Sequence, residues 1–416
     1  MKASYEKISV IGLGYVGLPM AAVMASRGVE VLGVDIDEKL VALINEGHLG
    51  IVEPDLDIMV HGAVSAGKLK AGTTPEAAEV FIIAVPTPFK DDHEPDLSFV
   101  ESASRALAPV LEKGNLIILE STSPVGTTEQ VAKWLAGIRS DLTFPHQAGE
   151  DADIQVAHSP ERVLPGQVLL ELVQNDRVVG GMTRRCAERA GEFYSSFIQG
   201  KCLLTDAPTA ELVKLMENSY RDVNIAFANE ISLVCDKLGI DVWEAVKLAN
   251  HHPRVKILNP GPGVGGHCIA VDPWFIVNSA PEQTRIIRTA REINSYMPSQ
   301  VVAKALEASK GKKSPRIACL GLSYKADIDD LRESPAVEIV AGLAGKKDVE
   351  IKVVEPHVDG LPDDLAGFSN ISFCSLDEAV DWADVIVLLA DHKQFRDMDQ
   401  KRLSTKAVVD TRGIWK

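Results

Sequence analysis

One cysteine of this 416-residue chain stands in a glycine-rich loop, four residues before a carboxylate. The segment runs Gly263-Val264-Gly265-Gly266-His267-Cys268-Ile269-Ala270-Val271-Asp272. A thiol on a mobile loop can be reached by a substrate, and as a thiolate Cys268 would attack an aldehyde. An inert thiol on a turn fits the segment equally well, so both interpretations stay open here. The other five cysteines, at positions 186, 202, 235, 319 and 374, fall in helix or strand patterns and are expected in the core.

Three glycines near the N-terminus are spaced G-x-G-x-x-G. Gly12, Gly14 and Gly17 follow an apolar strand pattern and open a helix, so backbone amides at the helix start can meet a pyrophosphate. Asp35 ends the next expected strand, roughly 20 residues further on, where its carboxylate can accept from both ribose hydroxyls. An acid there repels a 2′-phosphate, so the pattern predicts NAD rather than NADP. A glycine turn with only a structural role would not require Asp35 at this distance from Gly12, Gly14 and Gly17.

Polar residues line one face of a long helix that is expected over Thr209–Lys237. They share this face through spacings of i, i+3, i+7 and i+10: Glu211, Lys214, Asn218 and Arg221. A solvated helix face is the ordinary explanation of such a stripe. Asn218, however, has poor helix propensity, and the alternative is a stripe that faces a cleft, with Lys214 polarising a carbonyl or an oxyanion.

The charge and the histidines argue against several classes of partner. A formal net charge of -16 disfavours nucleic acid and membrane surfaces, because both are anionic. A small anionic ligand would need a local cluster of lysine and arginine. His251 and His252 precede Pro253 and Arg254 with no further ligand at metal spacing, so we expect no metal site.

The cysteines and the longest apolar run indicate a cytoplasmic protein. The cysteines are scattered, with no CxxC pair, which is typical of reduced thiols. The run Ile8–Ser26 is long enough for a membrane span but contains three glycines and Pro19. We therefore interpret it as a buried strand, a glycine turn and the start of a helix.

Strand and helix patterns alternate at both ends of the chain, as in parallel sheets. Strands are expected at Ile8–Gly12, Glu30–Asp35, Val80–Val85, Leu116–Glu120 and Ile154–His158, and then at Arg316–Gly321, Glu350–Glu355, Val385–Ala390 and Ala407–Asp410. Besides the long helix, helices are expected at Leu18–Arg27, Asp37–Asn45, Asp241–Asn250 and Thr284–Tyr296. The pattern predicts an α/β protein with two Rossmann-like doubly wound domains joined by a central helical region. The expected boundaries are 1–204, 205–304 and 305–416.

The second Rossmann-like copy lacks part of the glycine fingerprint. Its first strand ends in Gly321-Leu322-Ser323-Tyr324-Lys325, without counterparts of Gly14 and Gly17. A pyrophosphate cannot approach the backbone closely without those glycines. This domain is therefore expected to bind something other than a dinucleotide.

Further motifs occur in a fixed order along the chain: Pro86-Thr87-Pro88, Ser121-Thr122-Ser123-Pro124-Val125-Gly126, Pro160-Glu161-Arg162, Leu322-Ser323-Tyr324-Lys325 and Leu331-Arg332-Glu333-Ser334. With the glycine fingerprint, the Lys214/Asn218 helix and the Gly-Gly-His-Cys loop, they make the chain resemble the UDP-glucose/UDP-mannuronate-type dehydrogenases over essentially its whole length. Within that family, segments 160–166, 175–177 and 259–268 are most similar to the UDP-N-acetyl-D-mannosamine dehydrogenases.

The resemblance implies an NAD-dependent enzyme that oxidises the C6 hydroxyl of a UDP-sugar to a carboxylate by removing four electrons. Cys268 would add to the aldehyde as a thiohemiacetal, and the derived thioester would be hydrolysed. The covalent bond would hold the aldehyde while the cofactor exchanges. The other implied catalytic residues are Lys214 and Asn218 at the oxyanion, and Asp272, Glu161 and Thr122 for orienting water and protons.

The resemblance also implies how two nucleotides are held. NAD would contact Tyr15, Val16, Thr87 and Thr122 besides the glycines and Asp35. The UDP-sugar would contact Arg162, Val163, Lys214, Asn218, Arg221, His252, Arg254, Gly265, Tyr324, Lys325, Arg332 and Arg412. The cations among these would supply a local positive field for the diphosphate. Arg254 would reach in from the neighbouring subunit of a homodimer built around the long helix.

Two positions separate this chain from family members that oxidise UDP-glucose. Those members carry a second glutamate in place of Pro165 and a phenylalanine in place of Arg162. The difference favours an N-acetylated sugar, with UDP-N-acetyl-D-mannosamine expected and UDP-N-acetylglucosamine or UDP-glucose as alternatives. A catalytically silent protein that senses NAD or nucleotides is a remote alternative, which would need neither Cys268 nor Lys214.

Replacing Asp35 by alanine, together with Ile36→Arg as a basic neighbour, tests the ribose assignment. We expect the NAD/NADP ratio of kcat/KM to fall by roughly tenfold or more, because the carboxylate that accepts from the ribose is lost and a cation favours the 2′-phosphate. The measurement is steady-state kinetics with each cofactor. An unchanged ratio would show that Asp35 is not the ribose ligand.

Overall fold

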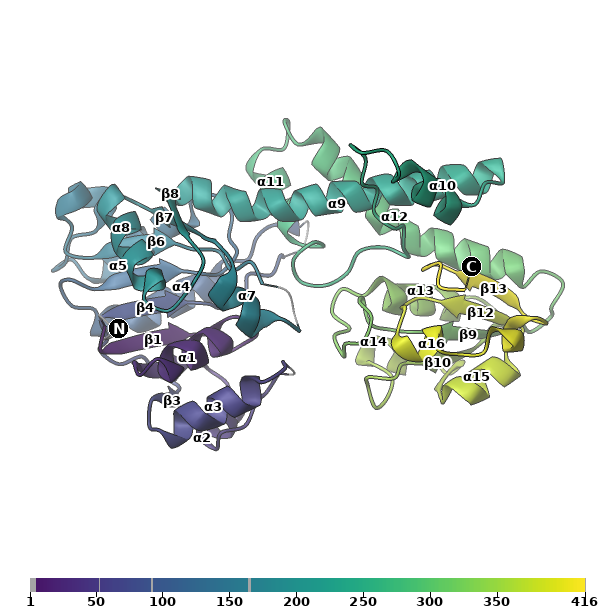
Figure 1. The fold of residues 1–416 in the computed structure, drawn as a ribbon, viewed down its shortest axis with the longest axis horizontal. Coiled ribbons are helices and arrows are strands. Elements are labelled where there is room, and N and C mark those ends of the chain that lie inside the picture. The colour runs from purple at the N-terminus through teal and green to yellow at the C-terminus, as the bar shows by residue number, and fades with distance from the viewer. Residues whose placement is uncertain (1–4, 52, 91–92, 164–165, 416) are drawn as a thin grey trace. The chain divides into compact units, whose positions relative to one another are not determined.

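In the computed structural model, residues 5–51, 53–90, 93–163 and 166–415 are described. The chain divides into two compact units, the first comprising Met1–Glu217 and Trp274–Ser279 and the second Asn218–Pro273 and Ala280–Lys416. Each unit contains one sheet flanked by helices (Figure 1). The predicted α/β class with two Rossmann-like domains is confirmed.

The first unit is built on an eight-stranded sheet with the order β3-β2-β1-β4-β5-β6-β7-β8. Its strands are β1 (Lys7–Ile11), β2 (Glu30–Val34), β3 (Leu69–Gly72), β4 (Val80–Ile83), β5 (Leu116–Leu119), β6 (Gln155–His158), β7 (Arg177–Gly181) and β8 (Cys202–Asp206). All neighbours are parallel except β6 and β7. The five predicted strands are present with ends shifted by one or two residues. Strands β3, β7 and β8 were not predicted.

Helices cover both faces of this sheet because its strands are buried on both sides. Val10 and Ile82 belong to one hydrophobic cluster, whereas Ile11, Phe81 and Ile83 belong to the other. This alternation is that of a parallel sheet between two helix layers. The helices are α1 (Gly17–Ser26), α2 (Glu38–Asn45), α3 (Leu56–Ser65), α4 (Ser98–Leu107), α5 (Thr127–Ile138), α6 (Pro145–Ala148), α7 (Val168–Gln174) and α8 (Arg184–Ser195).

The strand order reverses between β1 and β4, and ligands of open α/β sheets bind at such a switch point, beyond the carboxyl ends of the strands. The loops after β1, β4, β5 and β6 lie at this edge. They carry residues 12–17, 86–88, 121–126 and 159–162. The fold therefore gathers most of the N-terminal motifs at one edge of one sheet.

The second unit contains a five-stranded parallel sheet with the order β11-β10-β9-β12-β13. Its strands are β9 (Arg316–Leu320), β10 (Glu350–Val354), β11 (Ile371–Phe373), β12 (Val385–Leu388) and β13 (Ala407–Asp410). Its helices include α10 (Val242–Ala249), α13 (Pro335–Ala344), α14 (Asp363–Ala366), α15 (Leu376–Trp382) and α16 (Lys393–Arg396). The short strand β11 was not predicted.

Three further helices carry the central segment. The predicted long helix is present as α9 (Ala207–Leu238), and α11 (Asp272–Ser279) begins at the carboxylate of the cysteine motif. The helix predicted at Thr284–Tyr296 is wrong in its end, because α12 (Arg285–Ala308) continues through Pro298. Its apolar face continues beyond the proline with Val301 and Ala305, which are buried. Among the described residues, no helix combines the length and apolar character needed to cross a bilayer.

Candidate active site

The glycine fingerprint forms a cradle at the start of α1. Gly12 has a φ of +95°, and a Cβ on it would lie 2.6 Å from the carbonyl oxygen of Ala84. A Cβ on Gly17 would collide with the carbonyl oxygen of Gly12, whereas Gly14 faces open space. The N-cap residue of α1, Val16, makes no side-chain capping bond, and the first turn holds no acid. Such a helix start suits the pyrophosphate of NAD.

Asp35 holds the glycine turn against the end of β2. Its Oδ2 accepts a hydrogen bond from the amide of Leu13 at 2.9 Å, and its Oδ1 accepts from the amide of Asp37 at 3.1 Å. Each carboxylate oxygen retains acceptor capacity for a ribose hydroxyl. The loops after β4 and β5 are joined, since the Thr87 hydroxyl donates to the carbonyl of Thr122 at 2.6 Å. These residues fit NAD.

Glu161, after β6, is buried and held on both oxygens. Its Oε1 accepts from the amide of Arg162 at 2.6 Å, and its Oε2 forms an ion pair with Arg177. Arg177 also binds Glu120 Oε1 at 2.6 Å and lies over the ring of Tyr194, 4.3 Å from its centroid. The Tyr194 hydroxyl donates to the same Glu120 oxygen at 2.6 Å. The position of Glu161 is thus fixed by a buried polar network.

This network places one cation between two carboxylates in the protein interior. Burial raises the pKa of Glu120, although Arg177 acts in the opposite direction. Burial by itself would lower the pKa of Arg177, but the two carboxylates outweigh it and the pKa lies above its ordinary value. Arg177 therefore stays charged. It compensates the charge that Glu161 would otherwise bury alone.

Arg162 is engaged with protein groups rather than left in open solvent. Its Nη1 donates to Glu217 Oε1 at 2.7 Å, and its Nη2 donates to the carbonyl of Asp176 at 2.8 Å. A guanidinium has five N–H donors, so others remain for a ligand. Val163 is half-buried, and the Pro165 position of the family comparison lies outside the described residues.

The polar stripe of α9 contains both a structural residue and a candidate catalytic one. Glu211 accepts from the amides of Gly126 and Thr128, both at 2.7 Å, and so caps the start of α5. It thereby fixes the loop that carries Thr122. One turn further along α9, Lys214 is buried, and four residues later Asn218 is buried as well.

In the second unit, Cys268 lies on the turn that leads into α11. Its carbonyl accepts from the amides of Val271 at 3.1 Å and Asp272 at 2.8 Å. All six cysteines lie in the described part of the chain, and Cys268 alone is exposed. Asp272 is 3% exposed, and its carboxylate accepts from the Asn218 amide at 2.5 Å. The structure thus brings together Asn218 and Asp272 at the end of the cysteine turn.

The glycines of the cysteine loop let it dock against the segment after β9. A Cβ on Gly266 would lie 2.9 Å from the Tyr324 ring, and a Cβ on Gly265 would meet the Tyr324 side chain at 2.7 Å. The amide of Gly266 donates to the carbonyl of Arg332 at 3.1 Å. A Cβ on Gly261 would similarly lie 2.9 Å from Arg412 Nη1. Residues far apart in the sequence therefore meet around this loop.

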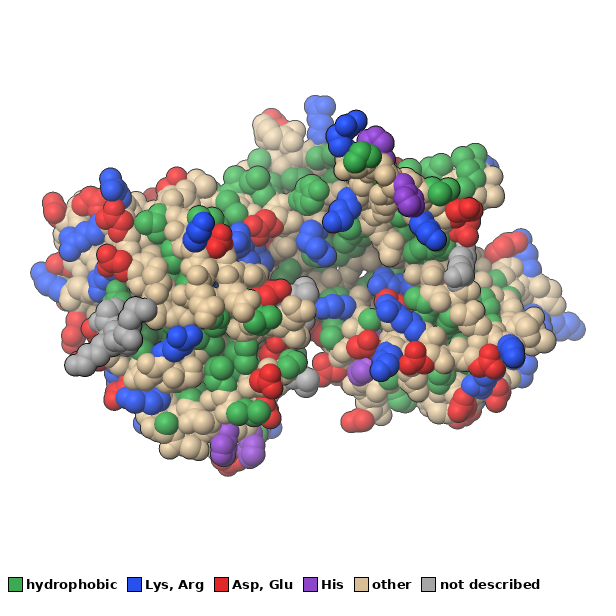
Figure 2. Space-filling view, in the orientation of Figure 1, with side chains coloured by type: hydrophobic (Ala, Val, Ile, Leu, Met, Phe, Trp, Pro, Cys, Tyr) green, Lys and Arg blue, Asp and Glu red, His purple; other side chains and the backbone are tan. Residues whose placement is uncertain are grey.

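Two of the arginines predicted to bind the diphosphate are paired with aspartates. Arg332 forms two hydrogen bonds with Asp330, and Arg412 binds Asp391 through Nε and Nη2. Lys and Arg are interspersed with Asp and Glu on the visible faces of the units (Figure 2). Arg221, His252 and Arg254 are exposed, and Lys325 is half-buried.

Comparison with known proteins assigns the family. Residues 6–198 match the NAD binding domain of the UDP-glucose/GDP-mannose dehydrogenase family, residues 208–296 its central domain and residues 318–416 its UDP binding domain. The chain belongs to this family. It is therefore an NAD-dependent oxidoreductase, as predicted, and the expected NAD and UDP domains are confirmed.

Several relatives match almost the whole chain. A UDP-N-acetyl-D-mannosamine dehydrogenase of Campylobacter jejuni is 60% identical, over 96% of this chain and 98% of the relative. An NDP-N-acetyl-D-galactosaminuronic acid dehydrogenase of Ralstonia nicotianae is 58% identical, over 99% and 96%. The solved structure of a UDP-D-ManNAc dehydrogenase from Pyrococcus horikoshii is 41% identical, covers 99% of this chain and 96% of its own, and has a TM-score of 0.89.

The residues that hold the candidate catalytic side chains in place were not predicted from the sequence. Arg177 stood only in a motif quoted for its resemblance, and Glu120 and Tyr194 were not singled out. Arg177 opens β7 and Glu120 directly follows β5, so an ionisable residue at a strand end was the available signal. The pairing of Glu161 with Arg177 depends on the antiparallel return of β7 beside β6, which was not predicted.

Replacing Arg177 by methionine removes the only cation that bridges Glu120 and Glu161 in the described network. We expect the free energy of unfolding of the first unit to fall by about 3–5 kcal/mol, because a buried charge loses its partner. Chemical denaturation followed by fluorescence measures this change. Arg184→Met, which breaks an exposed i,i+4 pair with Glu188, is the control and should leave the transition unchanged. Equal small effects of both substitutions would contradict the prediction.

Proposed function

We propose that the protein oxidises the C6 hydroxyl of UDP-N-acetyl-D-mannosamine to the carboxylate of UDP-N-acetyl-D-mannosaminuronate. The balanced reaction reduces two NAD⁺ to NADH, consumes one water and releases three protons. The observation that carries the proposal is the exposed thiol of Cys268, on a loop docked against the UDP-domain residue Tyr324. A protein that only senses nucleotides would not need a reactive thiol there.

Each residue of the proposed mechanism acts on a defined group. Bound NAD supplies the hydride acceptor for both oxidations. The Cys268 thiolate adds to the C6 aldehyde, and the Sγ–C6 bond persists as the thiohemiacetal becomes a thioester. Hydrolysis then breaks that bond and returns the thiol. Lys214 and Asn218 would stabilise the oxyanion. Asp272 and Glu161 would orient water and accept its protons, and the Thr122 hydroxyl would help to orient the water.

One hydrogen bond supports the part that we propose for the Asn218–Asp272 pair. The Asn218 amide donates to Asp272 at 2.5 Å, so this hydrogen bond fixes the direction of the carboxylate. Glu161 is comparably held by Arg177 and the amide of Arg162. In this proposal each of the two carboxylates, oriented within its own unit, would take part in proton transfer or water activation.

The sugar assignment rests on the relatives and on Arg162. Relatives named for UDP-N-acetyl-D-mannosamine reach 60% identity, which supports the manno sugar. Relatives named for NDP-N-acetyl-D-galactosaminuronic acid reach 58%, so the galacto sugar is a second candidate that the sequence analysis did not consider. The unused N–H donors of Arg162 suit an acetamido carbonyl or a phosphate in either case.

The assembly that we propose is a homodimer in the cytoplasm, with the α9 helix at its centre. One stripe of α9, within about 80° of arc, carries exposed apolar side chains. They are Leu212, Met216, Tyr220, Phe227, Val234 and Leu238. The exposed Arg254 would complete the partner's substrate site. Sedimentation velocity on wild type and Tyr220→Glu checks this, and a monomeric wild type would refute it.

The parts of the chain have separate tasks in this proposal. Residues 1–204 would bind NAD, residues 205–304 would provide Lys214 and the cysteine loop, and residues 305–416 would bind UDP. No nucleic acid or membrane takes part. We retain the absence of a metal as a prediction.

The decisive experiment counts NADH per sugar on UDP-N-acetyl-mannosamine, UDP-N-acetylglucosamine, UDP-N-acetylgalactosamine and UDP-glucose. We expect two NADH per sugar and the highest kcat/KM with the manno sugar. One NADH per sugar would refute the four-electron reaction. A preference for the galacto sugar would replace the first candidate by the second.

Cys268→Ser tests the covalent step. Uronate formation should fall by roughly three orders of magnitude or more, about 4 kcal/mol in transition-state stabilisation, because a weaker nucleophile replaces the thiolate. The matched control is Cys202→Ser, which changes a half-buried thiol in β8 and should retain activity. Wild-type NADH yield from Cys268→Ser would exclude the thioester route.

A further inference from the structure

The two Rossmann-like sheets begin with the same turn, built on different residues. The amide of Gly12 donates to the carbonyl of Val34 at 2.8 Å, and the amide of Gly321 donates to the carbonyl of Val354, also at 2.8 Å. Gly12 has a φ of +95° and Gly321 a φ of +98°. An acidic residue follows the second strand in both, Asp35 in the first unit and Glu355 in the second.

The two acids differ in what they bind. Asp35 is half-exposed and accepts two backbone amides, so it retains capacity for a ligand. Glu355 is buried, and its Oε2 accepts from the amides of Leu322 at 2.7 Å and Ser323 at 3.0 Å. The same oxygen lies 3.0 Å from His392 Nε2, and Oε1 accepts from the amide of His357 at 3.1 Å. Both carboxylate oxygens of Glu355 therefore bind groups of the protein itself.

The hydrogen bonds fix the tautomer of His392, whose side chain is fully buried. Its Nδ1 lies 2.9 Å from the amide nitrogen of Asp327, and an amide can only donate, so Nδ1 carries the lone pair. The proton of the neutral ring is therefore on Nε2. It faces Glu355 and also Ser323 Oγ, 3.2 Å away, whose own proton goes to the carbonyl of Lys325 at 2.7 Å.

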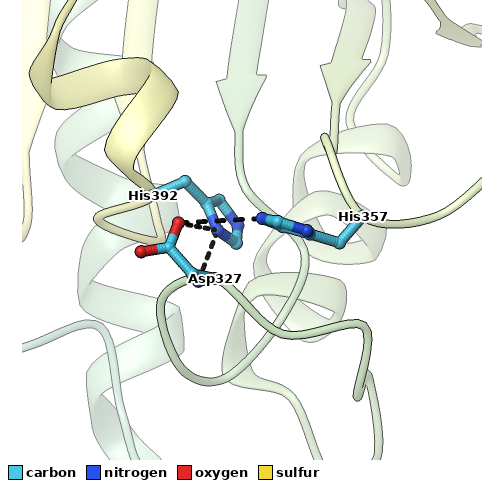
Figure 3. A group of neighbouring side chains, drawn as sticks. All are labelled: Asp327, His357 and His392. Carbon is cyan, nitrogen blue, oxygen red and sulfur yellow. Dashed lines mark hydrogen bonds and ion pairs between the residues drawn. The ribbon is translucent and has the colours of Figure 1, made fainter. Parts of the chain in front are cut away.

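The same bonds argue against a cation at this place. Asp327, His357 and His392 point toward one another (Figure 3), with Asp327 Oδ1 3.7 Å from a ring nitrogen of each histidine. Metal coordination by His392 needs a nitrogen lone pair. Its Nδ1 lone pair accepts the Asp327 amide, and its Nε2 carries a proton. The cluster is instead a set of hydrogen bonds that closes a loop.

That loop, residues 321–327, is the one that carries Tyr324 and Lys325. His392 binds both of its ends, through Ser323 and through the amide of Asp327. Asp327 in turn accepts from the amide of Lys393, next to His392, at 2.9 Å. Asp327 has a φ of +59°, an uncommon conformation for a residue other than glycine, so the surrounding bonds must maintain it.

We propose that His392, paired with Glu355, is a positioning residue for UDP that holds loop 321–327 in its ligand-binding shape before the nucleotide arrives. In the first unit, glycines leave space for a pyrophosphate next to the turn. In the second unit, the buried imidazole of His392 occupies the interior of the loop. The ligand would contact only the loop side chains that point outward, those of Tyr324 and Lys325. The inference rests on the proposed function in placing UDP at Tyr324 and Lys325.

The test measures UDP binding to the full-length protein by calorimetry, with UDP alone as the probe. His392→Phe removes the bonds to both Glu355 and Asp327 and should weaken UDP binding by on the order of tenfold, equivalent to about 1.4 kcal/mol. His392→Asn places an acceptor near the Nδ1 position, and His392→Gln places a donor near the Nε2 position. Each should give an intermediate loss.

Kinetics separate positioning from general destabilisation. In the His392 variants the KM for the UDP-sugar should rise, with kcat and the KM for NAD nearly unchanged. The matched control is Asn370→Ala, which removes two side-chain bonds to the carbonyls of Ala344 and Val349 in the same unit. It should lower the melting temperature without changing UDP affinity. An equal loss of UDP affinity in this control would overturn the positioning role.

A further variant distinguishes failure of the inference from failure of the proposed site. If Lys325→Ala loses UDP affinity but a folded His392→Phe does not, the inference is wrong and the UDP site stands. If neither loses affinity, UDP does not bind at this loop and both fail. Should His392→Phe not fold, His392→Asn, His392→Gln and Ser323→Ala decide, and wild-type UDP affinity in all three would refute the inference.

Discussion

Both nucleotide-binding sheets depend on one interaction, a carboxylate after the second strand that holds the turn after the first. The turn brings a glycine amide to the carbonyl that ends the neighbouring strand, which leaves the next amides directed toward the acid. With a short, half-exposed aspartate, the turn stays open to a ligand. With a buried glutamate, the turn is filled by protein. The acid after the second strand, together with the glycines that only the first turn has, thus distinguishes the turn of the NAD binding domain from that of the UDP binding domain.

Buried charged side chains in both units form ion pairs with side chains of opposite charge. The chain carries a formal charge of -16, yet its interior acids are compensated locally. Arg177 serves two glutamates, and Asp222 on α9 binds Arg291 on α12 at 2.7 Å. Burial raises the pKa of Asp222, and Arg291 works against that rise. Ion pairs of this kind compensate charges that are buried in the interior of each unit.

The sequence predicted those features that local periodicity encodes. The strand–glycine–helix start at Gly12, the long helix through Lys214 and the degenerate turn at Gly321 were all recognisable, because each is determined by residues close in sequence. The predicted C-terminal end of α12 was wrong. A proline normally ends a helix, but here the burial of Val301 and Ala305 stabilises the helix beyond Pro298. Strand β8 was missed because its side chains are largely exposed and show no apolar alternation.

Partners of candidate residues were the least predictable part of the site. Glu211 looked like one member of a catalytic stripe, but it caps α5 across 83 residues of sequence. Nothing in its spacing to Lys214 distinguishes the two roles. Arg162, expected to face the sugar, is tied to Glu217 on α9. Such pairings depend on tertiary contacts, which spacing along one helix or loop does not specify. The family resemblance named the chemistry, whereas the structure supplied what orients it.

The cysteine loop has a thermodynamic property that follows from its alternating composition. Glycines at 261, 263, 265 and 266 permit close approach to Arg412, Pro335 and Tyr324, but glycine has the largest backbone entropy to lose on ordering. Pro260 and Pro262, interleaved with the first of them, restrict φ in every state of the chain. They reduce the number of conformations open to the undocked loop. The segment before Cys268 therefore has residues small enough for close docking, while its prolines keep the undocked segment partly ordered.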